Sequence, residues 1–175
     1  MIDREKLTGV VLGGLVTGLL ISAIALIPKS RAAQIAEFFE EICISNHYAQ
    51  PTESLAAWGF EAVKDTDGSP LWVHPFTATF LKLEPRRCGL DTLAPLALSE
   101  TQARELLRLL EAIVKRRFPE LTYDPNAQMG SVHKGGAKGP PAHPSRWGVF
   151  FFAYPDWQES AGSTLFLVAP QGEPL

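Results

Sequence analysis

Residues 7–27 form an unbroken apolar run, which limits what this chain can become more than any other feature. The run, LTGVVLGGLVTGLLISAIALI, contains no charged, amide or proline side chain, and Lys6 and Lys29 bracket it closely. A helix of this length spans about 30 Å, the thickness of the hydrocarbon core of a bilayer. The sequence therefore predicts a transmembrane anchor over residues 7–28, preceded by a short cytoplasmic N-terminus, residues 1–6.

A cleaved secretory signal is the alternative interpretation of the same segment. Pro28 followed by Ser30, Arg31 and Ala32 resembles a helix breaker ahead of a small-x-small cleavage site. However, the apolar run is longer than the core of a typical signal peptide, and two acidic residues cancel the two basic residues of its N-terminal flank. We therefore expect a retained anchor and keep a secreted domain as the alternative.

Small residues recur every fourth position along the predicted anchor. Such stripes allow a second helix to approach closely enough for backbone contact. The alternative is that glycine is simply common in membrane helices. The pattern predicts that the anchor packs against a transmembrane helix of a larger membrane protein complex, in addition to membrane lipid. The candidate packing residues are Gly9, Gly13, Gly14, Gly18 and Ser22.

The two cysteines give the predicted orientation, because basic residues flank the apolar run equally on both sides. Cys43 and Cys88 both follow the anchor, and an even pair in an exported domain usually forms a disulfide. This predicts a Cys43–Cys88 bond and places the C-terminal domain in the periplasm, on a single-pass protein of the bacterial inner membrane. Two reduced core cysteines in a cytoplasmic domain are the alternative.

The residues after the anchor, 29–175, have a length that suits one domain. Apolar residues at helical spacing alternate with glutamates over 32–46, which directs Cys43 into the core. Ser99 and Gln102 have the spacing of a capping box at the start of a long amphipathic helix. We expect an α+β domain with an antiparallel sheet and two to three helices. The predicted helices are 32–46, 52–58 and 99–118, and the predicted strands are 60–63, 71–74, 79–83, 89–93, 147–154 and 163–168.

Residues 124–145 contain four glycines and four prolines and are predicted to form a flexible loop without regular structure. Loops of this length are usually functional or disordered, and this one is interpreted as a surface element that a partner orders. Its candidate contact residues are His133, Lys134, Lys138 and His143.

No motif in the sequence indicates a catalytic, cofactor or metal site. The glycines of 130–136 lack the Lys-Ser/Thr pair of a phosphate-binding loop. Ser131 and Lys134 have the spacing of penicillin-recognising enzymes, but the companion motifs are missing. No CxxC or HxxxH pair is present, and a formal net charge of −3 with scattered basic residues argues against nucleic acid.

The order of several residues resembles a group of uncharacterised small exported proteins of alphaproteobacteria. The shared features are the Phe39-x3-Cys43 spacing, a small helix ending in Gly59, a strand leading to Cys88, a helix near 99–118, and Trp72 and Trp147 at strand positions. The resemblance covers most of residues 34–175. It implies a periplasmic α+β domain with a Cys43–Cys88 bridge, and it implies no activity.

These observations predict a non-enzymatic accessory, stabilising or assembly subunit of a larger inner-membrane complex. Respiratory or photosynthetic complexes are natural hosts for such subunits in that bacterial group. The alternative is a free-standing exported domain that binds a ligand or carries an unrecognised activity, with a cleaved N-terminus.

Overall fold

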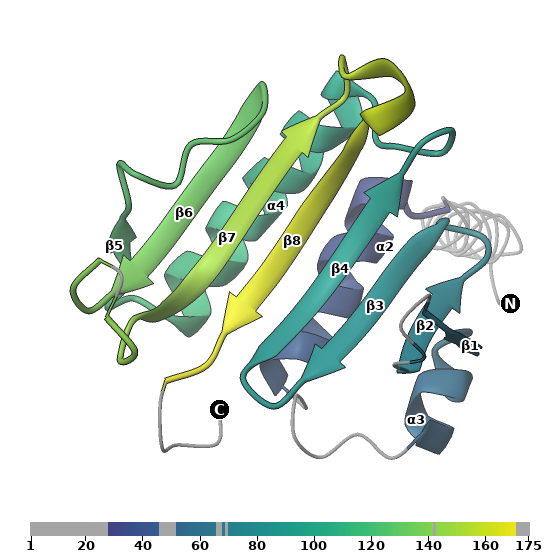
Figure 1. Ribbon diagram of the computed structural model, residues 1–175, viewed down its shortest axis with the longest axis horizontal. Coiled ribbons are helices and arrows are strands. Elements are labelled where there is room, and N and C mark those ends of the chain that lie inside the picture. Colours follow the sequence, from purple (N-terminus) through teal and green to yellow (C-terminus); the bar gives the residue numbers. More distant parts are fainter. Residues whose placement is uncertain (1–27, 46–51, 66–67, 69, 142, 171–175) are drawn as a thin grey trace, which may run out of the picture. The chain divides into compact units, whose positions relative to one another are not determined.

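The computed structural model describes residues 28–45, 52–65, 68, 70–141 and 143–170 (Figure 1). The chain divides into two compact units, residues 1–30 and 31–175. The apolar run 7–27, with the glycine stripe and Ser22, lies outside the described residues. Among the helices that are described, none combines the length and the apolar character needed to cross a membrane.

The second unit is an α+β domain built on one antiparallel sheet of eight strands in the order β1-β2-β3-β4-β8-β7-β6-β5 (Figure 1). This confirms the predicted fold class of the domain. The helices are α2 (Arg31–Phe38), η1 (Phe39–Ser45), α3 (Thr52–Ala57), α4 (Glu100–Arg117) and the short η2 (Gln158–Ser160). The strands are β1 (Glu61–Lys64), β2 (Pro70–His74), β3 (Thr79–Glu84), β4 (Arg87–Leu93), β5 (Thr122–Tyr123), β6 (Val132–Lys138), β7 (Trp147–Tyr154) and β8 (Gly162–Val168).

The domain consists of two halves with the same succession of elements. In each half, helical structure (α2, η1 and α3 in the first, α4 in the second) precedes four strands that form a meander. The last strand of each half, β4 and β8, pair at the centre of the sheet with Leu90 opposite Leu165. The amino-acid sequence shows no matching internal repeat, so the similarity is one of topology alone.

Helices α2 and α4 pack side by side on one face of the sheet (Figure 1). Helix α4 begins with the predicted capping box, in which Ser99 and Gln102 satisfy each other's backbone N–H groups. Its last turn carries three basic residues, which oppose the negative end of the helix dipole. Buried side chains from both helices and the adjacent strand face form the core, among them Ile35, Phe39, Leu106, Leu110, Phe151 and Leu165.

The first predicted helix is α-helical only up to Phe38 and continues as the π-helix η1. The wider π turn carries Cys43 against the central strand β4, where it forms a disulfide with Cys88. The Cα atoms are 5.4 Å apart, and neither cysteine is exposed to solvent. The predicted disulfide and the core-facing position of Cys43 are thus confirmed.

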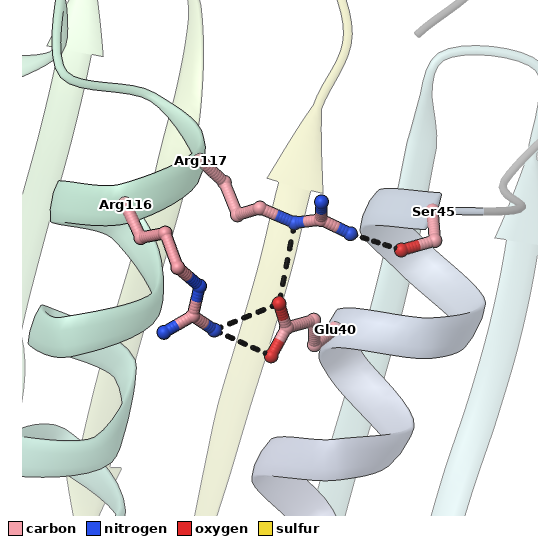
Figure 2. Close-up of polar contacts among 4 residues, drawn as sticks. All are labelled: Glu40, Ser45, Arg116 and Arg117. Atoms are coloured by element: carbon pink, nitrogen blue, oxygen red, sulfur yellow. Dashed lines mark hydrogen bonds and ion pairs between the residues drawn. The ribbon is translucent and has the colours of Figure 1, made fainter.

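An ion-pair cluster joins the first turn of η1 to the end of α4 (Figure 2). Arg116 Nη2 lies 2.8 Å from both carboxylate oxygens of Glu40, and Arg117 Nε lies 3.2 Å from Glu40 Oε1. Arg117 also donates a hydrogen bond to Ser45 Oγ. Exposed ion pairs stabilise a fold by less than about 1 kcal/mol each. We therefore infer that this cluster mainly fixes how the two helices are aligned and adds little to the free energy of unfolding.

The prediction of an unstructured loop over 124–145 is wrong for residues 132–138, which form strand β6. This strand pairs with β7 along its whole length, from Val132 opposite Ala153 to Lys138 opposite Trp147. Gly135, one of the glycines that suggested a loop, is required by close packing, because a Cβ atom there would lie 2.4 Å from the Cβ atom of Ala127. Backbone groups make the pairing, so a strand of small residues can form beside a strongly apolar neighbour.

The buried His74 is held in its neutral form between α2 and the turn after β2. The backbone N–H of Thr77 donates to His74 Nδ1 at 3.2 Å, so this nitrogen is an acceptor, and Thr77 Oγ1 lies 2.8 Å from it. The rings of Phe38 and Phe60 pack against the imidazole. Removal from water disfavours the charged imidazole and lowers the pKa of His74 below its ordinary value of 6.5.

We expect the free energy of unfolding to fall as the pH drops below about 6.5, because the unfolded chain then binds a proton that the folded domain excludes at His74. The stability that His74 contributes in its neutral form is fully present above the pKa that its side chain has in the unfolded chain. It is lost as the pH falls toward the lower pKa of His74 in the folded domain. Urea unfolding at about pH 7.5 and about pH 5.5 measures it. In His74→Gln, which keeps an acceptor but does not titrate, this part of the pH dependence should vanish; an unchanged pH dependence would contradict the assignment.

Candidate functional site: the open face of the sheet

The sheet has two different faces, and strand β7 shows the difference most clearly. Val149 and Phe151 belong to the buried core beneath the helices. Side chains alternate along a strand, so Phe150 and Phe152 point to the opposite face. No helix of the described residues covers that face (Figure 1). We call it the open face.

The strand register brings aromatic side chains of β3, β7 and β8 to the open face, together with polar side chains of β4. Paired residues of neighbouring antiparallel strands share a face. Phe166 on β8 lies opposite Phe150, and Phe80 on β3 lies opposite Asp91 on β4. The central members of the open face are Phe80, Arg87, Asp91, Phe150, Phe152 and Phe166.

Phe166 is the centre of this group. Its ring stacks on Phe150 with a centroid distance of 5.2 Å and lies 6.1 Å from the ring of Phe152. The guanidinium carbon of Arg87 lies 4.2 Å above the Phe166 ring, which is cation–π geometry. The three phenylalanines are half-buried although no other element of the described structure packs on them, because they cover one another.

Larger exposed apolar groups border the open face at the end where β7 leaves the sheet. The rings of Tyr154 and Trp157 are 4.7 Å apart, and Trp157 is 53% exposed. On β4, which lies on the other side of β8 from β7, Leu93 is 48% exposed. The apolar surface therefore continues from the centre of the open face to the ends of β7 and β4.

A single acidic side chain, Asp91, interrupts the aromatic centre. Burial among apolar groups raises the pKa of its carboxyl group, and a hydrogen bond with Thr164 and the charges of Arg87 and Lys82 partly offset this effect. Burial, with a smaller contribution from Asp91, also raises the pKa of Tyr154. The centre of the open face thus combines apolar rings with the partly desolvated carboxylate of Asp91 and the exposed guanidinium of Arg87, and Lys82 and Glu84 of β3 lie on the same face.

The four candidate residues of the predicted loop do not form one site. His133 lies on the open face with its Nδ1 atom 3.1 Å from the carbonyl oxygen of Gly130. Lys134 lies on the helix-covered face and forms an ion pair with Glu111 of α4. Lys138 and His143 are exposed near the turn that joins β6 to β7, where Ser145 Oγ lies 2.7 Å from His143 Nδ1. The candidate packing residues Gly9, Gly13, Gly14, Gly18 and Ser22 lie outside the described residues.

The sequence analysis missed the aromatic surface, although one signal for it is present. The segment of β7, WGVFFFAY, is apolar at every position, whereas a strand with one face in water usually alternates apolar and polar residues. Arg87 gives no such signal, because only the pairing of β4 with β8 brings it over Phe166.

Within the described residues no group of three or more His, Cys, Asp or Glu side chains is placed to hold a metal ion. Aromatic residues and arginine are the residue types enriched at the energetic centres of protein interfaces. In comparisons with known proteins, no family model, no curated protein and no solved structure matches this chain.

Proposed function

We propose that this protein is a membrane-anchored accessory or assembly subunit whose periplasmic domain binds another protein subunit through the open face. The cluster of Phe150, Phe152 and Phe166 beneath Arg87 is the observation that carries the proposal. A contiguous aromatic surface on a soluble domain marks an interaction site, because its exposure to water is costly.

A protein surface fits this face better than a small ligand does, because the face is a sheet surface that presents aromatic rings. Trp157 and Leu93 at its border supply side chains that can insert into a partner. The exposed Arg87 favours a partner that places a carboxylate opposite it. We therefore infer a partner surface with an apolar centre and acidic residues at its rim.

Two features support the membrane and periplasmic parts of this proposal: the apolar run in the sequence and the buried disulfide. An apolar run of the length of residues 7–27 suits a bilayer, and its glycine stripe suits contact with a second helix. A buried disulfide suits an oxidising compartment such as the bacterial periplasm. The alternative, a free-standing exported domain with a cleaved N-terminus, predicts no stable protein partner.

The test is purification of the full chain in mild detergent, with partner subunits quantified by mass spectrometry. We expect the double variant Phe152→Ser/Phe166→Ser to lose at least about tenfold of the co-purifying subunits, since both rings belong to the proposed contact centre. The matched control is Phe76→Ser, because Phe76 is 94% exposed and lies in the turn after β2, outside the open face. Equal losses in the double variant and in the control would contradict the open face as the contact site.

The same purification tests the anchor. Gly14→Leu/Gly18→Leu should release the partner while the domain stays folded, because leucine blocks close helix approach but suits lipid. Val16→Leu, on the opposite side of the predicted helix from Gly14 and Gly18, should leave the partner bound. A mature chain that begins near residue 33, found by intact mass, would overturn the anchor and leave the secreted-domain alternative.

A further inference from the structure

A cavity of about 550 Å³ opens between the C-terminal half of α4 and the outer strands β5, β6 and β7. It lies on the helix-covered side of the sheet, so it is separate from the open face. Its walls are mostly apolar, and the ring of Phe118, which packs edge-on against Trp147, forms part of them. The apolar walls are formed by Leu107, Leu110, Val114, Leu121, Val149 and Phe151.

The cavity exists because β6 presents a glycine to α4. Gly136 lies opposite Val149 in the strand register and therefore faces the helix, but it has no side chain to fill the space. A Cβ atom built on Gly136 would lie 3.6 Å from Leu121 Cβ and 3.8 Å from Val114 Cγ1, which is ordinary contact. The gap is thus not forced by crowding of the backbone, and a larger residue would fit there.

Charged side chains lie only at the mouth of the cavity. Lys134 of β6 and Glu111 of α4 form an ion pair between the two elements that form the opening, and Lys115 lies one turn further along the helix. The two side chains of the ion pair are 46% and 44% exposed, so the pair can open to water. Two ammonium groups against one carboxylate leave the mouth with a net positive charge.

We propose that this cavity binds a single-chain fatty acid, with the alkyl chain between α4 and β6 and the carboxylate at Lys134 and Lys115. The cavity volume falls within the range of small-molecule sites, and apolar walls with few polar groups are typical of them. Lys134 would exchange the carboxylate of Glu111 for that of the ligand, and the carboxylate of Glu111, which is 44% exposed, would then be solvated by water. This site is independent of the proposed protein contact on the open face.

Photolabelling of the full chain in lipid nanodiscs tests the site. The probe is a saturated carboxylic acid of about twelve carbons with a diazirine at its far end. We expect the label on peptides from 107–123 and 132–138, and we expect competition by the unlabelled acid at least about tenfold stronger than by its methyl ester, which lacks the charge. Label spread evenly over the domain, or equal competition by acid and ester, would overturn the proposal.

Variants at the cavity and at its mouth test the proposal, because each is expected to change labelling or competition in a stated direction. Gly136→Phe fills the cavity and should abolish site-specific labelling, whereas the matched control Gly89→Phe adds the same ring to the open face and should leave labelling unchanged. Gly89 is suitable because its Cβ position is also open, 3.8 Å from Phe166 Cβ.

Lys134→Met should weaken competition by the acid about tenfold, and Glu111→Gln should strengthen it about threefold by releasing Lys134. These surface variants keep the proposal testable even where Gly136→Phe impairs folding, which thermal unfolding would reveal. Unchanged affinity in both mouth variants would overturn the carboxylate assignment. The open-face variants that lose the partner subunit should still be photolabelled in the cavity. The experiment can therefore contradict the fatty-acid site without contradicting the protein contact on the open face, and the reverse.

Discussion

Replacing Cys43 and Cys88 together by alanine is expected to lower the free energy of unfolding by about 4 kcal/mol, which corresponds to a fall in Tm of about 10 °C. The bond closes a segment with a sequence separation of 45, and the loss of that constraint enlarges the conformational freedom of the unfolded chain. Both cysteines are fully buried, so the variant also leaves a small space where the two sulfur atoms packed.

Urea unfolding of the oxidised wild type and the double variant measures this effect. Cys43→Ala alone serves as a control for the packing loss, because it removes one sulfur atom and the bond but leaves the thiol of Cys88 in place. Freely alkylated thiols in freshly prepared, unreduced protein would contradict the disulfide itself. An unfolding midpoint that does not move would show that the bond contributes nothing to the folded domain.

Gly148→Ala is expected to destabilise the domain by about 3 kcal/mol, because strand β7 has no room for a side chain at this position. A Cβ atom there would lie 2.1 Å from the carbonyl oxygen of Gly136 and 2.8 Å from the Cα atom of Ala137. Both are backbone atoms of the paired strand, so β6 must move away from β7 to relieve the clash.

The matched control for this substitution is Gly89→Ala in β4, where the nearest atom to a new Cβ lies at 3.8 Å. We expect the control to change the free energy of unfolding by less than about 1 kcal/mol. Hydrogen exchange should also show faster exchange of the β6 amides in Gly148→Ala alone. Equal stabilities of the two variants would mean that β6 does not pair closely with β7 at Gly148.

Elements whose side chains carry a periodic pattern were predicted closely. Helix α4 was expected over 99–118 and spans Glu100–Arg117, because its apolar stripe and its capping box both depend on local sequence. Strand β7 was expected over 147–154 and has those bounds. The core-facing position of Cys43 followed from the same helical spacing.

Elements whose stability comes from their neighbours were not predicted. Strand β6 contains Gly135 and Gly136 and precedes two prolines, so its local composition is that of a loop. It is a strand because β7 offers a complete row of backbone partners. The π turn of η1 also depends on a distant residue, since it brings Cys43 to Cys88.

The two candidate sites are formed by residues that the fold brings together, and no sequence motif marks either of them. The open face needs the register of four strands to bring Phe80, Arg87, Phe150, Phe152 and Phe166 together. The cavity is defined by the absence of a side chain at Gly136 opposite α4. Neither spacing along the chain nor residue type reveals an arrangement of this kind before the fold is known.

The two-half topology has a consequence for the order in which the chain can fold. Each strand pair within a half joins neighbours in the sequence, whereas Thr92 and Ser163, which meet where the halves join, are 71 residues apart. Local pairings close faster than distant ones, so we expect the meander of β1–β4 to assemble early and the pairing of β8 with β4 to form last. Both cysteines belong to the first half. Oxidation can therefore lock that half before the second half has folded onto it.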